Sequence, residues 1–348
     1  MQKRVLLSGA TGLIGGELML ILAAKGVHST AVVRARDNVE ASSRLLSRLQ
    51  KSVLWKPEFT AMVSAEAGDI EAPNFGLNDS VIQSADVILH SAASTSFKPD
   101  AGVYPINIKA ATNFAGILKN LNPSQRGFFV GTAAVTMEPR GVITEDMAFA
   151  GYANDYNRSK RDAEILLRAS GAPFISLRPG IVFSRGIDDA KLARNMLWCI
   201  PVMAELGDVP LEPLARLDFA PVDFVAGAFA EMLLKTSLKH DCYHVSTGEA
   251  SMTFRALADE LMLTMPGIKK LIMRGRDYVP VPKFARQRWM FAALQPYLPF
   301  LTADAVFSNA RLRDEIGTLA DAPAPITYLS DMLGAFSLSD AVRQMYTP

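Results

Sequence analysis

Short apolar runs alternate with amphipathic segments through the first half of the chain. Runs of β-branched residues predict strands, and apolar positions spaced by three or four residues predict helices, here over 12–25 and 39–49. The expected strands cover 4–7, 30–34, 61–64, 87–90, 128–131 and 174–177. Strands that alternate with helices form parallel sheets covered on both faces, so the pattern predicts an α/β fold with a Rossmann-like doubly wound parallel sheet.

The pattern changes after about residue 186, where prolines become frequent and strand signals become short. Two later runs, 217–222 and 243–246, are expected to return to the sheet. The other segments predict a smaller, mostly helical C-terminal lobe that binds the substrate. The expected domains are a dinucleotide-binding domain over 1–186, with returns at about 217–246, and a substrate-binding lobe made of 187–216 and 247–348.

Composition narrows the class of protein. Hydrophobic residues make up 49% of the 348 residues and charged residues 20%, which is typical of a globular protein with a large core. The net charge of +1 gives no reason to expect a nucleic-acid partner. Cys199 and Cys242 lack metal-ligand spacing, so neither a metal site nor a disulfide framework is predicted, and a reducing cytoplasm is the expected location.

No signal peptide and no transmembrane segment are expected from the sequence. The richest apolar segment, 289–301, falls short of the roughly 18 residues that a span needs, and Pro296 and Pro299 interrupt it. We interpret this segment as a buried helix and loop that cover a pocket. Contact with a membrane surface or an oily substrate is the alternative.

A glycine-rich loop follows the first expected strand, with the spacing G-x-x-G-x-x-G. Glycine permits the turn, lets the main chain approach a pyrophosphate and lets the next helix lie close to the strand. The N-terminus of that helix offers free N–H groups to the phosphates. Because the loop lies between a strand and a helix, it predicts a dinucleotide site. The residues of this site are Gly9, Thr11, Gly12, Leu13, Ile14 and Gly15.

The end of the second strand indicates which dinucleotide binds. NAD sites usually carry an acidic residue there, about 20 residues after the loop. This strand ends in Arg34, and Arg36 follows closely. Since a guanidinium forms charge-assisted bonds to a 2′-phosphate, the predicted cofactor is NADP(H). Asp37 is the alternative, because it would be the acidic partner of NAD if the strand ran longer.

The third and fourth strands end in residues suited to a cofactor. The Asp69 carboxylate is expected to accept from the adenine amino group while the Ile70 amide donates, although Gly-Asp is also a common turn. His90 is expected to be packed and hydrogen-bonded rather than catalytic. Small residues after the fourth strand would let the backbone pass near the cofactor, and they are Ser91, Ala92 and Ala93.

The candidate catalytic residues follow the fifth strand. Tyr156 and Lys160 lie at the start of a helical pattern, and a spacing of four places them on one face. A neighbouring ammonium is expected to lower the pKa of the tyrosine, which then serves as general acid for a carbonyl. Thr132 lies at the carboxyl end of the fifth strand, where open parallel sheets bind ligands, and can donate to the substrate oxygen.

These motifs together resemble one protein family. The segments SGATGLIG, GDI, HSAAS, VGTAAV and YNRSK are similar to the extended short-chain dehydrogenases/reductases. Arg34-Ala35, Arg44-Leu45, LRPGIV and FAPVDFV make the chain most similar to the fatty acyl reductase and thioester reductase branch, the male-sterility-type NAD-binding proteins. The resemblance covers roughly residues 3–250.

The resemblance implies roles for individual residues. Thr132, Tyr156 and Lys160 would be the catalytic set, and Lys160 would also hold the nicotinamide ribose. Asn107 would support the lysine through the backbone or a water. The residues that would border the nicotinamide are Pro179, Ile181 and Val182. Family members often form homodimers through the helix that carries Tyr156, so a homodimer is one expected state.

The implied activity is hydride transfer from NADPH to a carbonyl carbon. The first hypothesis for the substrate is a hydrophobic acyl thioester, free or carrier-bound, or its aldehyde. The second is a ketone or aldehyde, as in sterol and dihydroflavonol reductases. A sugar-nucleotide epimerase or dehydratase is disfavoured by Arg34. A non-catalytic NADP-sensing protein is the hypothesis from another class, and the presence of Tyr156 and Lys160 speaks against it.

Overall fold

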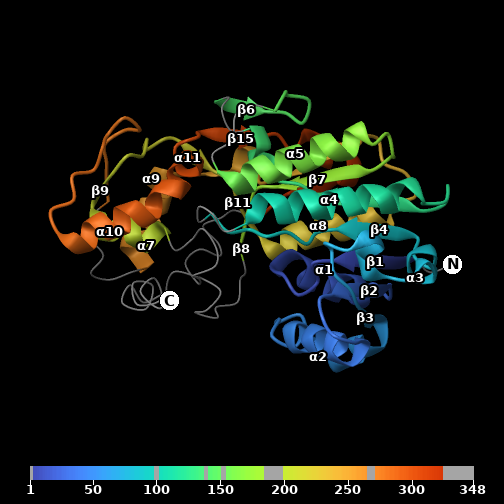
Figure 1. The fold of residues 1–348 in the computed structure, drawn as a ribbon. Coiled ribbons are helices and arrows are strands. Elements are labelled where there is room, and N and C mark those ends of the chain that lie inside the picture. The colour runs from blue at the N-terminus through green and yellow to red at the C-terminus, as the bar shows by residue number, and fades with distance from the viewer. Residues whose placement is uncertain are drawn as a thin grey trace.

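A seven-stranded parallel sheet forms the centre of the protein (Figure 1). The computed structural model describes residues 3–97, 102–136, 140–149, 154–183, 199–264 and 271–323. The strand order is β12-β7-β5-β4-β1-β2-β3, and every neighbouring pair is parallel. The strands of this sheet are β1 (Arg4–Ser8), β2 (His28–Val33), β3 (Val63–Ala67), β4 (Val87–His90), β5 (Arg126–Val130), β7 (Ile175–Pro179) and β12 (Cys242–Val245).

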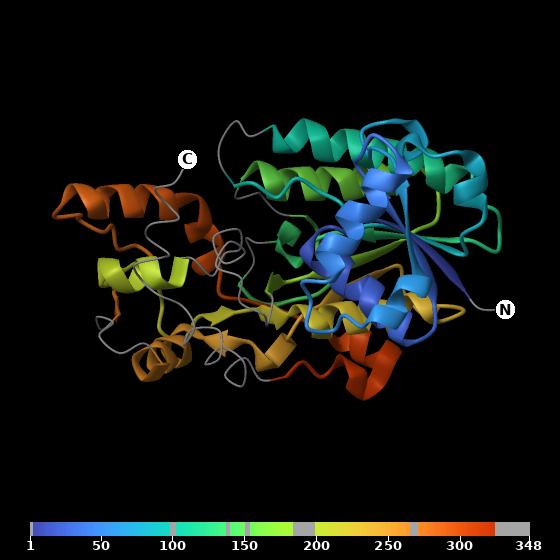
Figure 2. The same cartoon turned by 90° about the horizontal axis from the view of Figure 1, so that it is seen from below.

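Helices cover both faces of the sheet. The helices associated with it are α1 (Leu13–Ala24), α2 (Asn38–Leu49), α3 (Asp79–Gln83), α4 (Val103–Lys119), α5 (Asp155–Ala169) and α8 (Val222–Leu234). In Figure 2, the teal and green helices α4 and α5 lie above the sheet and the yellow helix α8 lies below it. Alternate strand residues serve the two sides, since Leu7 packs in the core under α1 and α8 while Leu6 packs in the core under α4 and α5.

Side-chain caps start two of these helices. The Asp37 carboxylate accepts from the Glu40 N–H at 2.9 Å and begins α2. The Asn154 side chain accepts from the Asn157 N–H at 3.0 Å and begins α5. Because each cap satisfies an N–H group that has no partner within its helix, both fix where the chain turns into the helix.

A smaller lobe projects beyond the carboxyl ends of the strands and lies at the left of Figure 2. Its core contains Phe183, Met203, Phe254, Met290 and Leu294. The helices after α8 are α9 (Phe254–Thr264), α10 (Ala285–Leu294), α11 (Leu298–Leu301) and α12 (Ala310–Ile316), and α7 (Cys199–Leu206) precedes it. The short strands outside the main sheet are β6 (Gly141–Ile143), β8 (Ile181–Phe183), β9 (Asp208–Val209), β10 (Arg216–Leu217), β11 (Phe219–Pro221), β13 (Met252–Thr253), β14 (Ile272–Met273) and β15 (Ala305–Phe307).

The predicted Rossmann-like α/β fold is confirmed, and each of the six strands expected in the first half overlaps a strand of the sheet. The expected return of 243–246 is also confirmed, as β12. The expected return of 217–222 to the main sheet is wrong, because β11 pairs with β8 in a separate two-stranded sheet. Strand β8 comes directly after β7 in the chain but lies outside the main sheet, and β11 pairs with β8 rather than with a strand of the main sheet.

One part of the expected lobe lies elsewhere. Residues 310–320 were expected in the substrate lobe, but Leu312 and Ala320 are buried in the core beneath the main sheet. Helix α12, at the red end of the colour scale, lies against the main unit in Figure 2. Apolar residues at the end of a chain can join whichever core is near, and spacing alone does not say which.

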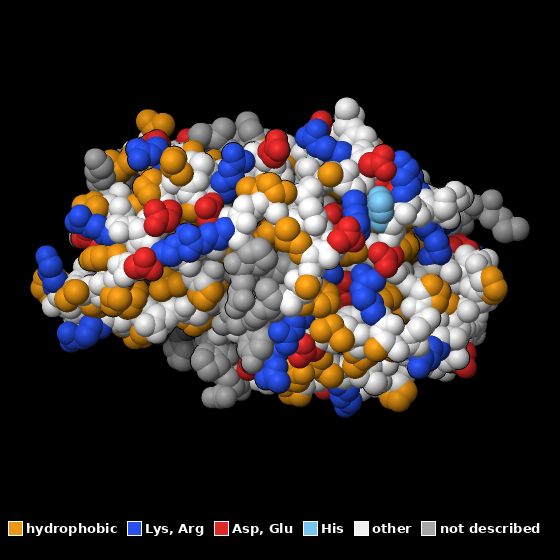
Figure 3. All heavy atoms as spheres, turned by 90° about the horizontal axis from the view of Figure 1, so that it is seen from above, with side chains coloured by type: hydrophobic (Ala, Val, Ile, Leu, Met, Phe, Trp, Pro, Cys, Tyr) orange, Lys and Arg blue, Asp and Glu red, His pale blue; other side chains and the backbone are white. Residues whose placement is uncertain are grey.

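The surface shown in Figure 3 carries charged side chains of both signs. On the face shown in Figure 3, Lys and Arg side chains are interspersed with Asp and Glu rather than gathered by sign. Across the described ranges, no helix combines the length and the apolar character that a membrane crossing requires.

Candidate active site

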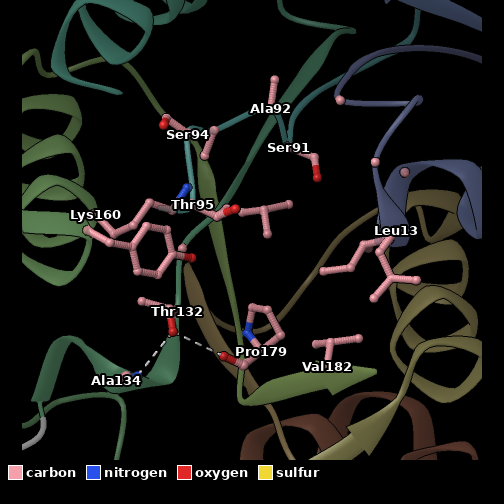
Figure 4. Close-up of a pocket in the computed structure, with 18 of the residues that line it drawn as sticks. Leu13, Ser91, Ala92, Ser94, Thr95, Thr132, Ala134, Lys160, Pro179 and Val182 are labelled. Atoms are coloured by element: carbon pink, nitrogen blue, oxygen red, sulfur yellow. Dashed lines mark hydrogen bonds between the residues drawn. The ribbon is translucent and has the colours of Figure 1, made fainter. Parts of the chain in front are cut away.

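A cavity of about 750 Å³ lies at the carboxyl ends of the strands, between the sheet and the lobe. It adjoins the point where the strand order reverses between β1 and β4, which is where open α/β sheets bind ligands. In Figure 4, Leu13 and Lys160 lie on opposite sides of the cavity, with Ser91 and Ala92 at one end and Thr132 and Pro179 at the other.

The structure brings nearly all of the predicted site residues to this cavity. Asn107 is the exception and is buried behind the wall. The predicted residues that line the cavity are Gly9, Thr11, Gly12, Leu13, Ile14, Gly15, Arg34, Asp69, Ile70, Ser91, Ala92, Ala93, Thr132, Tyr156, Lys160, Pro179, Ile181 and Val182.

The glycine loop lies tightly against its surroundings. Gly9 has φ +86°, and a Cβ there would lie 2.7 Å from the Ala92 nitrogen. A Cβ at Gly15 would lie 2.4 Å from the Gly9 carbonyl oxygen. No side chain caps α1 at Gly12, and no acidic residue occupies its first turn. The N–H groups of that turn therefore remain available to an anion such as a pyrophosphate, and the residues fit a dinucleotide.

The carboxylate of Asp37 serves as a helix cap rather than as part of the cavity wall. It caps α2 and does not line the cavity, while Arg36 pairs with Glu40 at 2.9 Å and is 87% exposed. Arg34 and Arg44 do line the cavity, and the Arg44 guanidinium donates to the Arg34 carbonyl oxygen. Two cations therefore lie where an NAD site would carry a carboxylate.

Helix α5 presents Tyr156 and Lys160 one turn apart at the cavity wall. Tyr156 is half-buried, and Lys160 is buried with its Nζ atom 4.5 Å from the centre of the Phe129 ring. Burial lowers the pKa of Lys160 to about 8, against an opposing effect of the nearby Glu164 carboxylate. At pH 7 the lysine is therefore mainly protonated.

The expected lowering of the Tyr156 pKa by Lys160 is wrong. Burial raises the pKa of Tyr156 to about 12, because the apolar surroundings, with the Phe97 ring 5.5 Å away, disfavour the phenolate. The phenol therefore keeps its proton at neutral pH. That protonation state is the one a general acid needs when a carbonyl is reduced.

Thr132 lies at the end of β5 and is 7% exposed. Its Oγ1 atom accepts from the Ala134 N–H at 3.3 Å and is 3.5 Å from the Pro179 carbonyl oxygen, its acceptor (Figure 4). Both contacts are long, so the hydroxyl can turn toward a ligand at little cost.

Asn107 on α4 connects the loop after β4 to α5. Its Oδ1 atom accepts from the Ser94 N–H at 2.8 Å, and its Nδ2 atom donates to the Ser94 carbonyl oxygen at 3.0 Å and to Ser159 Oγ at 2.8 Å. Ser159 Oγ in turn donates to the Tyr156 carbonyl oxygen at 2.7 Å. On α5, the side chain of Asn107 therefore contacts Ser159, the neighbour of Lys160 in the chain, and the implied support for Lys160 stays a prediction.

His90 is packed and hydrogen-bonded, as expected. Its Nδ1 atom is 2.7 Å from Ser8 Oγ, and the ring is 2% exposed. Burial, and next the charge of Lys160, lower the pKa of His90 to about 3, so the imidazole is neutral.

The Asp69 carboxylate accepts from the Glu71 N–H at 2.9 Å and closes the local turn.

Several residues at the cavity were not predicted. Arg44 is one of the residues that carry the family resemblance, and the spacing of the apolar residues of α2 indicates only that Arg44 lies off the buried face of the helix. Phe97 had no signal of its own. Tyr297 and Phe300 belong to the segment 289–301 and line the cavity, as expected of a segment that covers a pocket, whereas Trp289 of the same segment is exposed rather than buried.

Asp218 is a further unpredicted residue at the cavity. Its Oδ1 atom accepts from the Thr247 N–H at 2.9 Å and from the Thr247 hydroxyl at 2.5 Å. Burial raises the pKa of Asp218 to about 6, although the bonds from Thr247 oppose this. A Cβ at Gly180 would lie 2.2 Å from Asp218 Oδ2, so Gly180 allows the carboxyl group to lie against this part of the wall.

Comparison with known proteins adds a family. The family model described as "Male sterility protein", an NAD-binding family, matches residues 7–229. The chain belongs to this family. The predicted branch of the extended short-chain dehydrogenases/reductases is thereby confirmed, and so is a nicotinamide-dependent oxidoreductase at the level of the family.

Individual relatives are more distant. The chain is 27% identical over 212 residues to peramine synthetase ppzA of Metarhizium rileyi, covering 56% of this chain and 7% of the relative. It is 26% identical over 273 residues to aldehyde reductase lnbA of Aspergillus flavus, covering 70% of this chain and 26% of the relative. The chain thus spans about a quarter of the length of one of these relatives and less than a tenth of the other.

Among solved structures, the terminal R domain of the myxalamid PKS-NRPS biosynthetic pathway has a TM-score of 0.74. The match covers 99% of this chain and 92% of that domain at 21% identity. At this identity the likeness establishes the fold, including the lobe, and not the reaction.

Proposed function

We propose that the protein is an NADPH-dependent reductase that transfers hydride to the carbonyl carbon of a hydrophobic acyl thioester or of its aldehyde. The observation that carries the proposal is the single cavity that joins the glycine loop of β1–α1 to Thr132, Tyr156 and Lys160. The main unit would hold the cofactor, and the lobe made by α7, α9, α10 and α11 would hold the substrate.

The choice of NADP over NAD rests on the charges at the end of β2. Arg34 and Arg44 line the cavity, and the Asp37 carboxylate is used as a helix cap. A 2′-phosphate there would receive charge-assisted bonds from one or both guanidinium groups. The end of β2 offers no carboxylate at the cavity to the ribose hydroxyls of NAD. The carboxylates that line the cavity belong to Asp69, Glu71 and Asp218, which lie on later segments of the chain.

The remaining cofactor contacts are proposed from the same cavity. The backbone N–H groups at the start of α1 would hold the pyrophosphate, and the segments 69–70 and 91–93 would flank the adenine side. Pro179, Ile181 and Val182 would border the nicotinamide, and Lys160 would bond to its ribose. When bound, NADPH supplies the hydride; the protein supplies the orientation and the proton.

The catalytic roles follow from the electrostatics of the wall. The Tyr156 hydroxyl, which burial keeps protonated, donates its proton to the carbonyl oxygen. The Thr132 hydroxyl and the Lys160 ammonium stabilise the negative charge that develops on that oxygen. The Lys160 ammonium is held near Phe129 on the same side of the cavity.

The substrate class is supported by the lobe and by relatives. Phe97, from the loop after β4, and the lobe residues Tyr297 and Phe300 line the cavity and pack against the core of the lobe. One relative is named an aldehyde reductase and another a peramine synthetase, and a similar structure is the terminal R domain of a PKS-NRPS biosynthetic pathway. A carrier-bound thioester is therefore the first substrate to test, and a free aldehyde the second.

The test measures NADPH oxidation with a long-chain acyl thioester, its aldehyde and a bulky ketone. We expect turnover with the thioester or the aldehyde, and about a 100-fold or larger loss of turnover in Tyr156→Phe, which lacks the acidic proton. NADPH binding of this variant should equal that of the wild type. Full turnover in Tyr156→Phe would refute the mechanism. Activity on the ketone alone would support the sterol-reductase type, and NADPH binding without any turnover would support a sensor.

A further inference from the structure

Three aromatic side chains from distant parts of the chain meet beside Tyr156. The Phe97 ring lies 5.5 Å from the Tyr156 ring, 4.8 Å from the Tyr297 ring and 5.0 Å from the Phe300 ring, centre to centre. The Phe97 and Phe300 rings are stacked and nearly parallel, with an angle of 13° between their planes. Phe97 follows β4, whereas Tyr297 and Phe300 belong to the lobe. We call Phe97, Tyr297 and Phe300 the aromatic wall.

The aromatic wall belongs to the lobe core on one side and to the cavity on the other. All three residues pack against the buried cluster that contains Phe254, and all three line the cavity. They are only partly buried. Apolar ring surface is therefore left facing the space next to the proposed proton donor, and an apolar ligand group placed there would complete its burial.

The composition of this corner also disfavours polar groups. A charged or strongly polar substituent against the Phe97 and Phe300 rings would lose water without gaining hydrogen bonds from them. The rise in the Tyr156 pKa has the same physical cause, since apolar surroundings around the phenol disfavour a charge. The wall thus separates substrates by the polarity of the group next to the carbonyl.

We infer that Phe97, supported by Phe300, is the residue that selects the substituent on the reacting carbonyl, and that it favours a flat or extended apolar acyl group over a polar one. The inference rests on the proposed reductase activity and assigns the recognition of its substrate. Phe97 contacts the acyl group of the substrate and so keeps the reacting carbonyl within reach of Tyr156. Phe300 fixes the plane of the Phe97 ring.

The experiment compares the wild type with Phe97→Ala, Phe300→Ala and Phe284→Ala. Phe284 lies in the same part of the chain as the lobe residues, is 67% exposed and does not line the cavity, so it is the matched control. The substrates are octanal, benzaldehyde and succinic semialdehyde, a short aldehyde with a carboxylate. Each enzyme is assayed for kcat and KM, and its Kd for NADPH is measured without substrate.

In Phe97→Ala we expect kcat/KM for octanal and benzaldehyde to fall about 10- to 100-fold, mainly through KM, because a ring contact and its burial are lost. The value for succinic semialdehyde should change less than about 3-fold, and the Kd for NADPH less than about 2-fold. Phe300→Ala should shift the ratio of apolar to polar substrate in the same direction by less, and Phe284→Ala should leave it unchanged.

An unchanged ratio in Phe97→Ala, with the wild type active, would overturn the assignment while leaving the proposed activity intact. Inactivity of the wild type toward every carbonyl compound would overturn both. If Phe97→Ala does not fold, Phe97→Leu replaces it: this variant keeps apolar volume but removes the ring, so benzaldehyde should lose more than octanal. An equal loss for the two aldehydes in Phe97→Leu would contradict a role for the ring.

Discussion

At the scale of single residues, two guanidinium groups carry the proposed preference for NADP. Arg34 is exposed at the end of β2, and Arg44 on α2 donates to its carbonyl oxygen. This bond brings the Arg44 side chain back over the end of β2, so that both cations face one cavity. Arg36, only two residues from Arg34, is engaged by Glu40 instead.

Replacement of Arg34 by Ala should raise the KM for NADPH about 10- to 100-fold and leave the KM for NADH nearly unchanged, because a charge-assisted bond to the 2′-phosphate contributes about 1.5–3 kcal/mol. Steady-state kinetics with both coenzymes give the ratio. Arg36→Ala is the control and should leave the ratio as it is. A ratio that stays constant in Arg34→Ala would show that this guanidinium does not contact the phosphate.

The sequence could predict Arg34 because strand ends line the binding edge of a parallel sheet, so a position alone implied a role. It could not separate Arg34 from Asp37, because a carboxylate at a helix start serves equally well as a cap or as a ligand to a ribose. Only the bond from the Glu40 N–H decides between the two. The raised pKa of Tyr156 was likewise beyond the sequence, since burial depends on Phe97, which lies far away along the chain.

At the scale of elements, Asn107 holds the cavity together by joining α4, the loop after β4 and α5. The loop residue Ser94 is bonded at both its N–H and its carbonyl oxygen, in the manner of a strand neighbour. Ser159, bonded by the same amide, lies between Tyr156 and Lys160 on α5. The loop that carries Phe97 is thus tied to the helix that carries Tyr156, the proposed proton donor.

Asn107→Ala should loosen this loop without unfolding the protein. Three polar partners lose their bonds, so the free energy of unfolding should fall by about 1–3 kcal/mol. Amide hydrogen exchange over 91–97 should become faster than in the wild type, and kcat should fall while α1 exchanges as before. Thr112→Ala, at an exposed position on the same helix, should change none of these. Unaltered exchange over 91–97 in Asn107→Ala would show that other contacts hold the loop.

Helices and strands with a clear pattern of apolar residues could be predicted from the sequence, whereas the aromatic wall could not. Central strands such as β1 and β4 are largely apolar because helices cover both faces of the sheet, as is usual in parallel sheets. Strand β11 has the same apolar character and yet pairs with β8, because pairing partners are chosen in space and not by composition. Phe97 and Phe300 meet across about two hundred residues, and no local pattern in either segment contains that contact.

At the scale of the whole molecule, a buried ion pair joins helix α5 to the sheet. Glu164 of α5 accepts from Arg178 of β7 at 2.7 Å and 3.0 Å, and both side chains are almost fully buried. Arg168 contacts the same carboxylate at 3.0 Å. The Arg178 guanidinium also donates to the Glu145 carbonyl oxygen at 3.3 Å, so a third segment is included. The pair therefore fixes α5, and with it Tyr156 and Lys160, against the strands.

Removal of the Glu164 charge should destabilise the fold strongly and in a pH-dependent way. Glu164→Gln leaves the Arg178 cation buried without its counter-charge, which should lower the free energy of unfolding by about 3–5 kcal/mol at pH 7. Burial acts to raise the pKa of Glu164, but Arg178 and Arg168 together hold it below its usual value. A depressed carboxyl pKa stabilises the folded state above the unfolded-state pKa of about 4.3, and this contribution is lost as the pH falls through the folded-state pKa.

The difference in stability between wild type and Glu164→Gln should therefore be largest from about pH 5 upward and shrink toward acid, as urea unfolding at several pH values would measure. Glu40→Gln is the matched control, because it removes one carboxylate from an exposed pair with Arg36, and such pairs contribute little to stability. It should unfold like the wild type at every pH. A Glu164→Gln protein as stable as wild type at pH 7 would mean that the hydrogen bonds of the amide suffice and that the charge of the pair contributes nothing to holding α5 in place.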